Sequence, residues 1–131
     1  MTAKGIHVLC MLFSFAWIVL ESEATTFDYN RNVDFPRTTT SRAVNYCDNI
    51  IRAKNITNQK YNVFIHEPEN VIKNLCPDGY TGPVRTPVLH VTLCRYLYGY
   101  LVITGRYPLA IYCENGLITE YSLTLRLGGK L

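Results

Sequence analysis

The second half of the chain is rich in apolar, β-branched and aromatic residues, and short polar or glycine-containing turns interrupt it. Such runs are typical of strands. The Asn115-Gly116 pair is a strong signal for a tight hairpin turn between two strands. The pattern therefore predicts a series of antiparallel strands, at residues 88–98, 101–103, 107–113 and 118–127.

The first half contains segments of two kinds. Apolar positions from Tyr46 to Lys54 follow helical spacing, and Pro68 suits the first turn of a second helix that ends near Cys76. Residues 61–66 alternate and predict a strand, whereas the proline and glycine residues of 77–87 predict a loop. The order of helix, strand, helix and then antiparallel strands predicts an α+β domain.

Residues 1–24 have the features of a secretory signal peptide. A lysine at position 4 precedes an apolar run from Ile6 to Leu20, and Ser22-Glu23-Ala24 places small residues where a signal peptidase cuts. The apolar run is shorter than the ~20 residues that a membrane-spanning helix needs. We therefore expect cleavage near Ala24, a secreted extracellular product and a single domain at 25–131, in which 25–44 is an extended or mobile N-terminal segment.

Charge and cysteine content narrow the class of protein. The leader holds one lysine and two glutamates of the chain's 13 basic and 10 acidic residues, so the remainder has a formal net charge of +4. Its basic residues are scattered, unlike the clusters of an electrostatic nucleic-acid binder. Four cysteines remain, which in a short secreted chain indicate two disulfides. Because there is no CxxC pair and histidine is scarce, we predict no metal site and no cofactor.

Two surface features have alternative interpretations. Asn55-Ile56-Thr57 is an acceptor triplet for N-glycosylation, which predicts a glycoprotein. Tyrosines at 96, 98 and 100 alternate, as they would in a stacking surface for single-stranded nucleic acid. Cross-strand packing is the simpler explanation of that spacing, and we favour it.

Four segments in order resemble the pancreatic ribonuclease family. They are Asn45–Thr57, Val63–Glu67 followed by Val71–Cys76, Val91–Arg95, and Tyr112–Asn115. The resemblance implies the ribonuclease A-like fold, a curved antiparallel sheet with short helices beside it. It also implies the pairing of the cysteines, Cys47 with Cys94 and Cys76 with Cys113. The family's other two bridges have no cysteines here, and one of them would have used the position of Asn58.

The departures from the family concern its catalytic residues. Counting along the chain places the family's two catalytic histidines on Val33 and Ser122, and its catalytic lysine on Gln59, beside Lys60. The base-reading threonine corresponds to Val63. Since an acid–base group contributes ~10²–10⁴ in rate, the resemblance predicts that the chain is not an enzyme. Lys60 and His66 are the remaining candidates for anion contacts, although His66 and His90 are expected to be structural.

Three functions follow as hypotheses. The first is a secreted ribonuclease-like protein that acts by binding. The segment Asn32–Pro36 resembles the divergent, non-catalytic branch of the family, which is found in the epididymis and linked to sperm maturation. The second is a weakly active ribonuclease with a rearranged site, and the third is a cationic host-defence protein. We expect a monomer whose partner is a protein or a cell surface, with weak nucleic-acid binding as a further activity.

Overall fold

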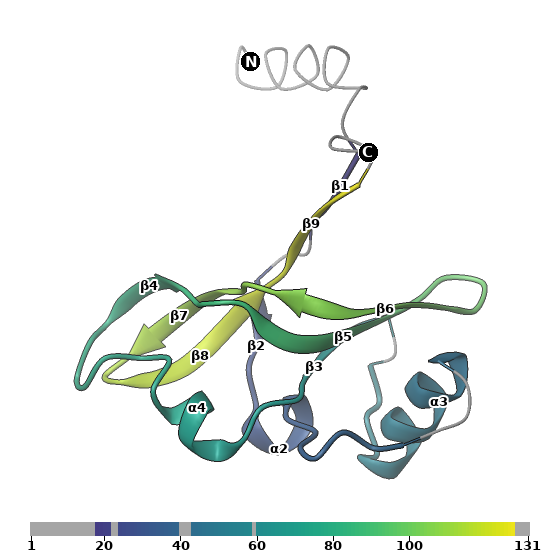
Figure 1. Cartoon of the computed structure of the whole chain (residues 1–131), viewed down its shortest axis with the longest axis horizontal. Helices are drawn as coiled ribbons and strands as arrows, with labels where there is room; N and C mark the ends of the chain where they lie inside the picture. Colours follow the sequence, from purple (N-terminus) through teal and green to yellow (C-terminus); the bar gives the residue numbers. More distant parts are fainter. Residues whose placement is uncertain (1–17, 22–23, 40–42, 59, 128–131) are drawn as a thin grey trace.

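The computed structural model describes residues 18–21, 24–39, 43–58 and 60–127. Three antiparallel sheets carry the fold, and their strands are joined in the orders β3-β5-β6, β2-β8-β7-β4 and β1-β9. Figure 1 shows the first two sheets side by side as one curved layer, with the helices beneath it. The α+β prediction of an antiparallel, ribonuclease A-like sheet with short helices and two disulfides is confirmed.

The elements follow in chain order. The strands are β1 (Ile18–Glu21), β2 (Thr25–Thr26), β3 (Tyr61–Ile65), β4 (Gly82–Arg85), β5 (Leu89–Tyr96), β6 (Tyr100–Tyr107), β7 (Ala110–Glu114), β8 (Leu117–Ser122) and β9 (Thr124–Leu127). The helices are α2 (Tyr29–Asn32), α3 (Ala43–Ala53) and α4 (Glu69–Lys73). Helix α3 overlaps the helix predicted from Tyr46 to Lys54 but begins three residues earlier. Pro68 lies immediately before α4 rather than in its first turn, and α4 ends at Lys73 rather than near Cys76.

Two segments differ from the predictions. The expected loop at 77–87 contains β4, which pairs with β7 at the edge of its sheet. An edge strand tolerates Pro83 because one side of it needs no ladder hydrogen bond. Residues 25–44, expected to be extended or mobile, include β2 and the single turn α2. Local sequence does not reveal these elements because both are fixed by contacts with distant strands.

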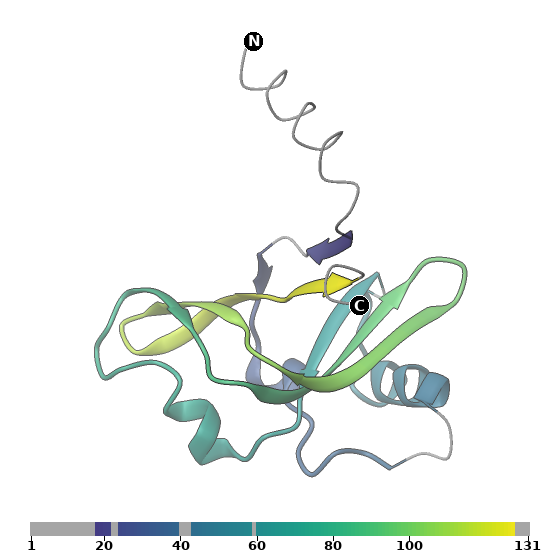
Figure 2. The ribbon, with the colours of Figure 1, turned by 45° about the horizontal axis from the view of Figure 1, so that its top comes forward.

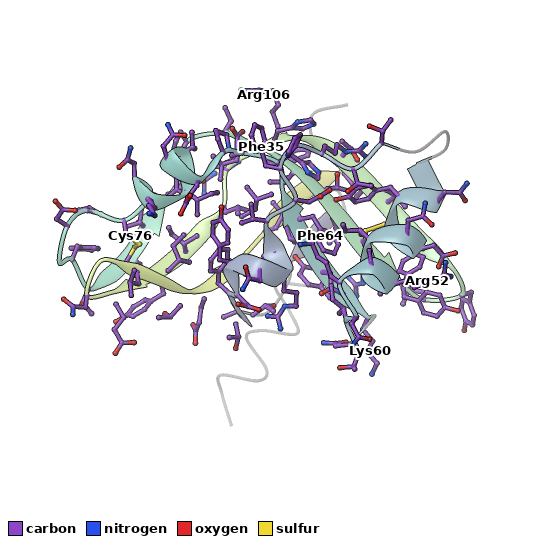
Figure 3. All side chains as sticks on the ribbon, turned by 90° about the horizontal axis from the view of Figure 1, so that it is seen from below. Phe35, Arg52, Lys60, Phe64, Cys76 and Arg106 are labelled. Atoms are coloured by element: carbon purple, nitrogen blue, oxygen red, sulfur yellow. A yellow bond between two sulfur atoms is a disulfide. The ribbon has the colours of Figure 1, made fainter. Side chains whose placement is uncertain are left out.

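The core has two parts. The larger cluster lies between the sheets and α4, and it includes Val63, Leu89, Leu109 and Tyr121. The smaller one joins α3 to the β3-β5-β6 sheet around Tyr46 and Phe64; Figure 3 labels Phe64 beside α3. Amphipathic α3 therefore has a packing partner on only one side, which leaves its other face to solvent.

A disulfide fastens each part of the core. Cys47 of α3 is bonded to Cys94 of β5, and Cys76, which follows α4, is bonded to Cys113 of β7. These are the pairs that the family resemblance implies. All four cysteines are buried.

The end of the chain leaves the main layer. After β8, the chain continues into β9, which pairs with β1 outside the curved layer, as Figure 1 shows, and Figure 2 shows the same ribbon turned by 45°. The rest of the expected leader, 1–17 and 22–23, lies outside the described residues. Within the described part of the chain, no helix has the length and hydropathy to cross a membrane.

Candidate functional site

Three elements meet where the family resemblance led us to expect catalytic residues. Asn32 ends α2, Val63 lies in the middle of β3, and Tyr121 lies in β8. The Asn32 side-chain amide donates to the Val63 carbonyl oxygen at 2.9 Å and to the Tyr121 phenol oxygen at 3.3 Å. The backbone N–H of Val63 also donates to this phenol oxygen, at 3.4 Å. A closed polar cluster therefore joins the three elements.

Two of these residues, Asn32 and Tyr121, are each one position earlier than the residues reached by counting, whereas Val63 is itself an expected family position. Val33 packs into the core and bridges to Ile65, and Ser122 pairs with Ala110 at the opposite end of the β7–β8 ladder from the hairpin turn. A β-bulge between Tyr112 and Cys113 shifts the register of this ladder. Because neighbouring side chains of a strand lie on opposite faces, a count that differs by one residue names the wrong face.

The Asn32–Tyr121 cluster is shut off from solvent. Asn32 and Tyr121 are 1% and 2% exposed. Strand β2 covers the cluster by pairing Thr25 with Tyr121, and the Phe27 ring meets the Tyr121 ring edge-on at 6.4 Å. Burial raises the pKa of Tyr121, so its hydroxyl stays protonated near neutral pH. The contacts of this cluster hold α2, β3 and β8 together.

His66 is the centre of a second buried network. Its Nδ1 donates to the backbone carbonyl of Asp34 at 2.9 Å, which leaves Nε2 to accept from the Thr92 hydroxyl at 2.8 Å. The Thr104 hydroxyl lies 3.0 Å from that of Thr92 and continues the chain. Burial lowers the pKa of His66 and favours its neutral form. With both nitrogens engaged and 4% exposure, His66 is not an anion contact, and this expectation is corrected.

The carboxylate of Asp34 ties the N-terminal segment to α3. It accepts from the Tyr46 hydroxyl at 2.7 Å and from the N–H and hydroxyl of Thr38 at 3.0 and 2.9 Å. Burial alone would raise the pKa of Asp34, but these hydrogen bonds together lower it. The guanidinium of Arg37 lies 4.4 Å above the Tyr46 ring.

The two histidines of the described chain are neighbours. The rings of His66 and His90 have centroids 5.1 Å apart, and the backbone N–H of His66 donates to the backbone carbonyl of His90. The Glu67 carboxylate accepts from the backbone N–H of His90 at 2.9 Å. This proximity depends on the pairing of strand segments far apart in sequence, so periodicity alone could not show it.

An open polar pocket lies beside the closed cluster, and sequence reasoning missed it. It has a volume of about 500 Å³ between β2, α2, the end of α3 and the start of β3. Its cations are Arg31 and Lys54, and its acid is Asp28. Amides and hydroxyls supply the other polar groups, from Thr25, Thr26, Asn30, Asn55, Thr57, Asn58, Tyr61 and Asn62.

Backbone carbonyls hold both cations in place. Lys54 Nζ donates to the Asn30 carbonyl at 2.7 Å and to that of Val33 at 3.2 Å. Arg31 donates to the Thr26 carbonyl at 2.7 Å. Since a guanidinium has five donors and an ammonium has three, both groups keep N–H groups for a ligand. Two tethered cations against one carboxylate suit a singly charged anionic group.

Three predicted site residues lie near this pocket. Asn55 and Asn58 line it, and Asn55 is exposed and has a left-handed backbone with φ of 56°. Lys60 is exposed, and its carbonyl accepts from the Tyr96 N–H, which places it at the base of the β5–β6 hairpin. Gln59, the counted position of the family's lysine, lies outside the described residues.

The fold and sequence were compared with known proteins. The family model described as pancreatic ribonuclease matches residues 22–86. Green turtle egg white ribonuclease has a similar structure, with a TM-score of 0.63 and 22% identity over 71% of this chain and 91% of that chain. Amphinase, a cytotoxic ribonuclease from Rana pipiens oocytes, has a TM-score of 0.52 and 20% identity over 73% of this chain and 92% of that chain. No curated protein sequence matches the chain.

These findings correct one expectation. The absence of the family's histidines led to the prediction that the chain is not an enzyme, but the matching model and the similar folds are those of ribonucleases. The absence of two histidines shows only that the family's usual acid–base pair is missing, and the same fold also positions other polar groups. The pancreatic ribonuclease model thus matches 65 of the 131 residues, and the similar structures show that the chain has a ribonuclease A-like fold.

Proposed function

We propose that this protein is a secreted ribonuclease-like protein that acts by binding, and that single-stranded RNA is the ligand of its open polar pocket. The observation that carries the proposal is the pairing of tethered Arg31 and Lys54 with a dense set of amides and hydroxyls in about 500 Å³. A cation suits the phosphate of a nucleotide, and amides suit the ribose and the base edges.

The charge of the pocket sets the expected strength of binding. Arg31 and Lys54 are opposed by Asp28 in the lining. For single strands the logarithm of affinity falls by about 0.7 per neutralised phosphate as the logarithm of salt rises. One or two phosphate contacts therefore predict weak binding, with a salt slope of roughly −0.7 to −1.4.

Binding and cleavage can be measured on one RNA. Fluorescence anisotropy with a labelled single strand should show weak, salt-dependent binding that falls several-fold in Arg31→Gln. Arg85→Gln removes an exposed arginine from β4, away from the pocket, and should bind as the wild type does. Equal binding by the wild type and Arg31→Gln would refute the pocket as the RNA site.

The same samples decide the alternative function. RNA cleavage above that of a mock preparation, reduced in Arg31→Gln but not in Arg85→Gln, would assign this pocket to a ribonuclease with a rearranged site. The family match makes this measurement necessary beside the binding assay.

Secretion and tissue form the finer part of the proposal. The leader-like residues 1–24 and the two disulfides support an extracellular protein, because disulfides persist in oxidising compartments. The resemblance of Asn32–Pro36 to the epididymal branch supports a role in the male reproductive tract and in sperm maturation. Antibody detection in epididymal fluid and in sections of the same tissue tests both points. Signal inside cells with none in the fluid would contradict secretion.

We further propose that Asn55 carries an N-linked glycan. Asn55 is exposed two residues after the end of α3, and it is one of the residues that line the pocket. Digestion with a glycosidase should lower the apparent mass of the secreted protein, and Asn55→Gln should abolish this shift. A glycan here would stand beside the ligand, so the RNA measurements need both the glycosylated and the digested protein.

A further inference from the structure

The β5–β6 hairpin projects beyond the rest of the described chain at the end that carries α3, as Figures 1 and 2 both show. Its apex is the three-residue connection Leu97-Tyr98-Gly99, closed by a hydrogen bond from the Leu97 N–H to the Gly99 carbonyl. This backbone hydrogen bond closes the connection, so the side chains of Leu97 and Tyr98 are presented from a short loop.

The apex exposes large apolar side chains on both of its sides. Tyr98 is fully exposed, Leu97 is 63% exposed, and Tyr96 and Leu101 are 43% and 41% exposed. Tyr96 and Tyr100 stack edge-on across the hairpin with ring centroids 5.1 Å apart. Cross-strand packing thus accounts for these two tyrosines, as favoured from the sequence, but it leaves Tyr98 and both leucines without cover.

Basic residues surround the base of the hairpin. Arg95 precedes Tyr96 and pairs with Leu101, and the Lys60 carbonyl accepts from the Tyr96 N–H. Arg52 of α3 shares a cavity of about 240 Å³ with Tyr100 and Asp48. Figure 3 places Arg52 and Lys60 at the end of the molecule away from Cys76. An apolar apex above three cations and one acid has the amphipathic order of a membrane-binding surface.

We propose that this hairpin docks on membranes that contain anionic lipid, with Leu97 and Tyr98 entering the interface and the basic residues facing the headgroups. Tyrosine is favoured at the interface because its ring is apolar and its hydroxyl stays hydrated. Anionic headgroups complement Arg52, Lys60 and Arg95.

The geometry favours a bilayer over single-stranded RNA at this place. Stacking proteins present aromatic rings along a basic groove. Here the apex is convex, it includes two leucines that have no π-face, and the Tyr96 and Tyr100 rings are already in edge-on contact with each other. A bilayer interface accepts leucine and tyrosine together on a projecting loop.

Vesicle binding tests the proposal with the secreted protein recovered from expressing cells. It should sediment with vesicles of phosphatidylcholine containing about a third phosphatidylserine, and much less with phosphatidylcholine alone. Leu97→Ser/Tyr98→Ser should weaken binding by roughly tenfold or more, because affinity scales with the apolar area inserted. Arg52→Gln should weaken it about fivefold and only at low salt, since each cation near such a surface contributes about that factor.

A control variant separates the hairpin from exposed apolar surface in general. Leu117→Ser removes a side chain that is 71% exposed on the β7–β8 hairpin, and it should bind vesicles as the wild type does. Equal losses in Leu117→Ser and in the double variant would overturn the assignment. Unchanged circular dichroism in every variant shows that the fold is kept.

A fluorescent reporter measures insertion directly. The only tryptophan in the sequence is Trp17, within the expected leader, so Tyr98→Trp gives the processed chain a single tryptophan. Its emission should shift to shorter wavelength with anionic vesicles and should be quenched by brominated lipid. Tyr112→Trp, at a 42% exposed site on β7, should show neither effect.

Two results would refute membrane docking. One is the absence of a Tyr98→Trp shift with anionic vesicles. The other is single-stranded RNA binding that is lost in Leu97→Ser/Tyr98→Ser while vesicle binding persists, which would assign the hairpin to RNA instead.

Discussion

Asn32 and Tyr121, 89 residues apart in sequence, meet through a buried hydrogen bond of 3.3 Å between the Asn32 amide and the Tyr121 phenol oxygen. The phenol oxygen also accepts from the Val63 N–H. One hydroxyl therefore satisfies donors from two other elements. The amide does not titrate and burial raises the pKa of the phenol, so both groups stay neutral near neutral pH. Their buried hydrogen bonds stabilise the fold at this position.

Removing the phenol oxygen should destabilise the fold. Tyr121→Phe keeps the ring but leaves the Asn32 amide and the Val63 N–H short of an acceptor in the core. The expected loss in free energy of unfolding is about 1–3 kcal/mol, measured by urea denaturation. Tyr112→Phe, at an exposed site on β7, should change stability by less than about 0.5 kcal/mol. Similar values for the two variants would show that the buried hydrogen bonds contribute little.

Stability should depend on pH through His66. Burial, the largest influence, lowers its pKa below the ordinary value of 6.5, so the unfolded chain takes up a proton before the folded chain does. The contribution of His66 is therefore complete above pH 6.5 and is lost as the pH falls toward the folded pKa. In that window the loss is up to about 1.4 kcal/mol per pH unit.

Urea unfolding at several pH values checks this sign. His66→Gln should be less stable than the wild type at pH 7.5 and should lose less stability on acidification to pH 5. Protonation of Asp34 does not contribute to the change in stability between pH 6.5 and 5, because the pKa of Asp34 lies below its ordinary value of 3.8. A wild-type curve that is flat between pH 6.5 and 5 would contradict a lowered pKa at His66.

The disulfides should contribute similar free energies. Cys47–Cys94 and Cys76–Cys113 close loops with sequence separations of 47 and 37. Restriction of the unfolded chain predicts about 4 kcal/mol for each, and the two values should lie within a few tenths of each other. Paired Cys→Ala variants followed by chemical denaturation test this. A much larger loss for Cys47→Ala/Cys94→Ala would show that the bond also holds α3 on the sheet.

The β7–β8 turn should require glycine at position 116. Gly116 has φ of +84°, and a Cβ there would lie 3.0 Å from the backbone nitrogen of Gly79. Gly116→Ala should therefore cost about 1–3 kcal/mol in thermal or urea unfolding. Gly99 is the matched control, because a Cβ there meets nothing within 4 Å. Destabilisation by Gly99→Ala equal to that by Gly116→Ala would contradict this account of the turn.

Sequence patterns predicted most of the fold because its elements have strong local signals. The apolar spacing of α3, the alternation in β3 and the Asn115-Gly116 turn are all read within a few residues. Strand β4 was missed because its prolines and glycines usually mark loops, and only its pairing with β7 makes it a strand. Helix α2 is a single turn, fixed by the side chain of Asn32 rather than by periodicity.

The candidate site was less accessible to sequence reasoning. Counting reached Val33 and Ser122, whereas the buried cluster is built from Asn32 and Tyr121, and the contact between His66 and His90 requires the register of β3 and β5. The polar pocket combines Arg31 of α2 with Lys54, which directly follows α3, and nothing in the local sequence shows that these two cations meet. Non-local geometry of this kind is set by the tertiary fold.

The position of β2 has a consequence for maturation. This strand consists of Thr25 and Thr26, directly after the expected cleavage point at Ala24, and Thr25 pairs with Tyr121. Proteolytic processing that removed only two further residues would delete a strand and uncover the edge of β8. Secreted molecules that begin at Thr25 and molecules that begin two residues later would therefore differ in compactness and in protease resistance.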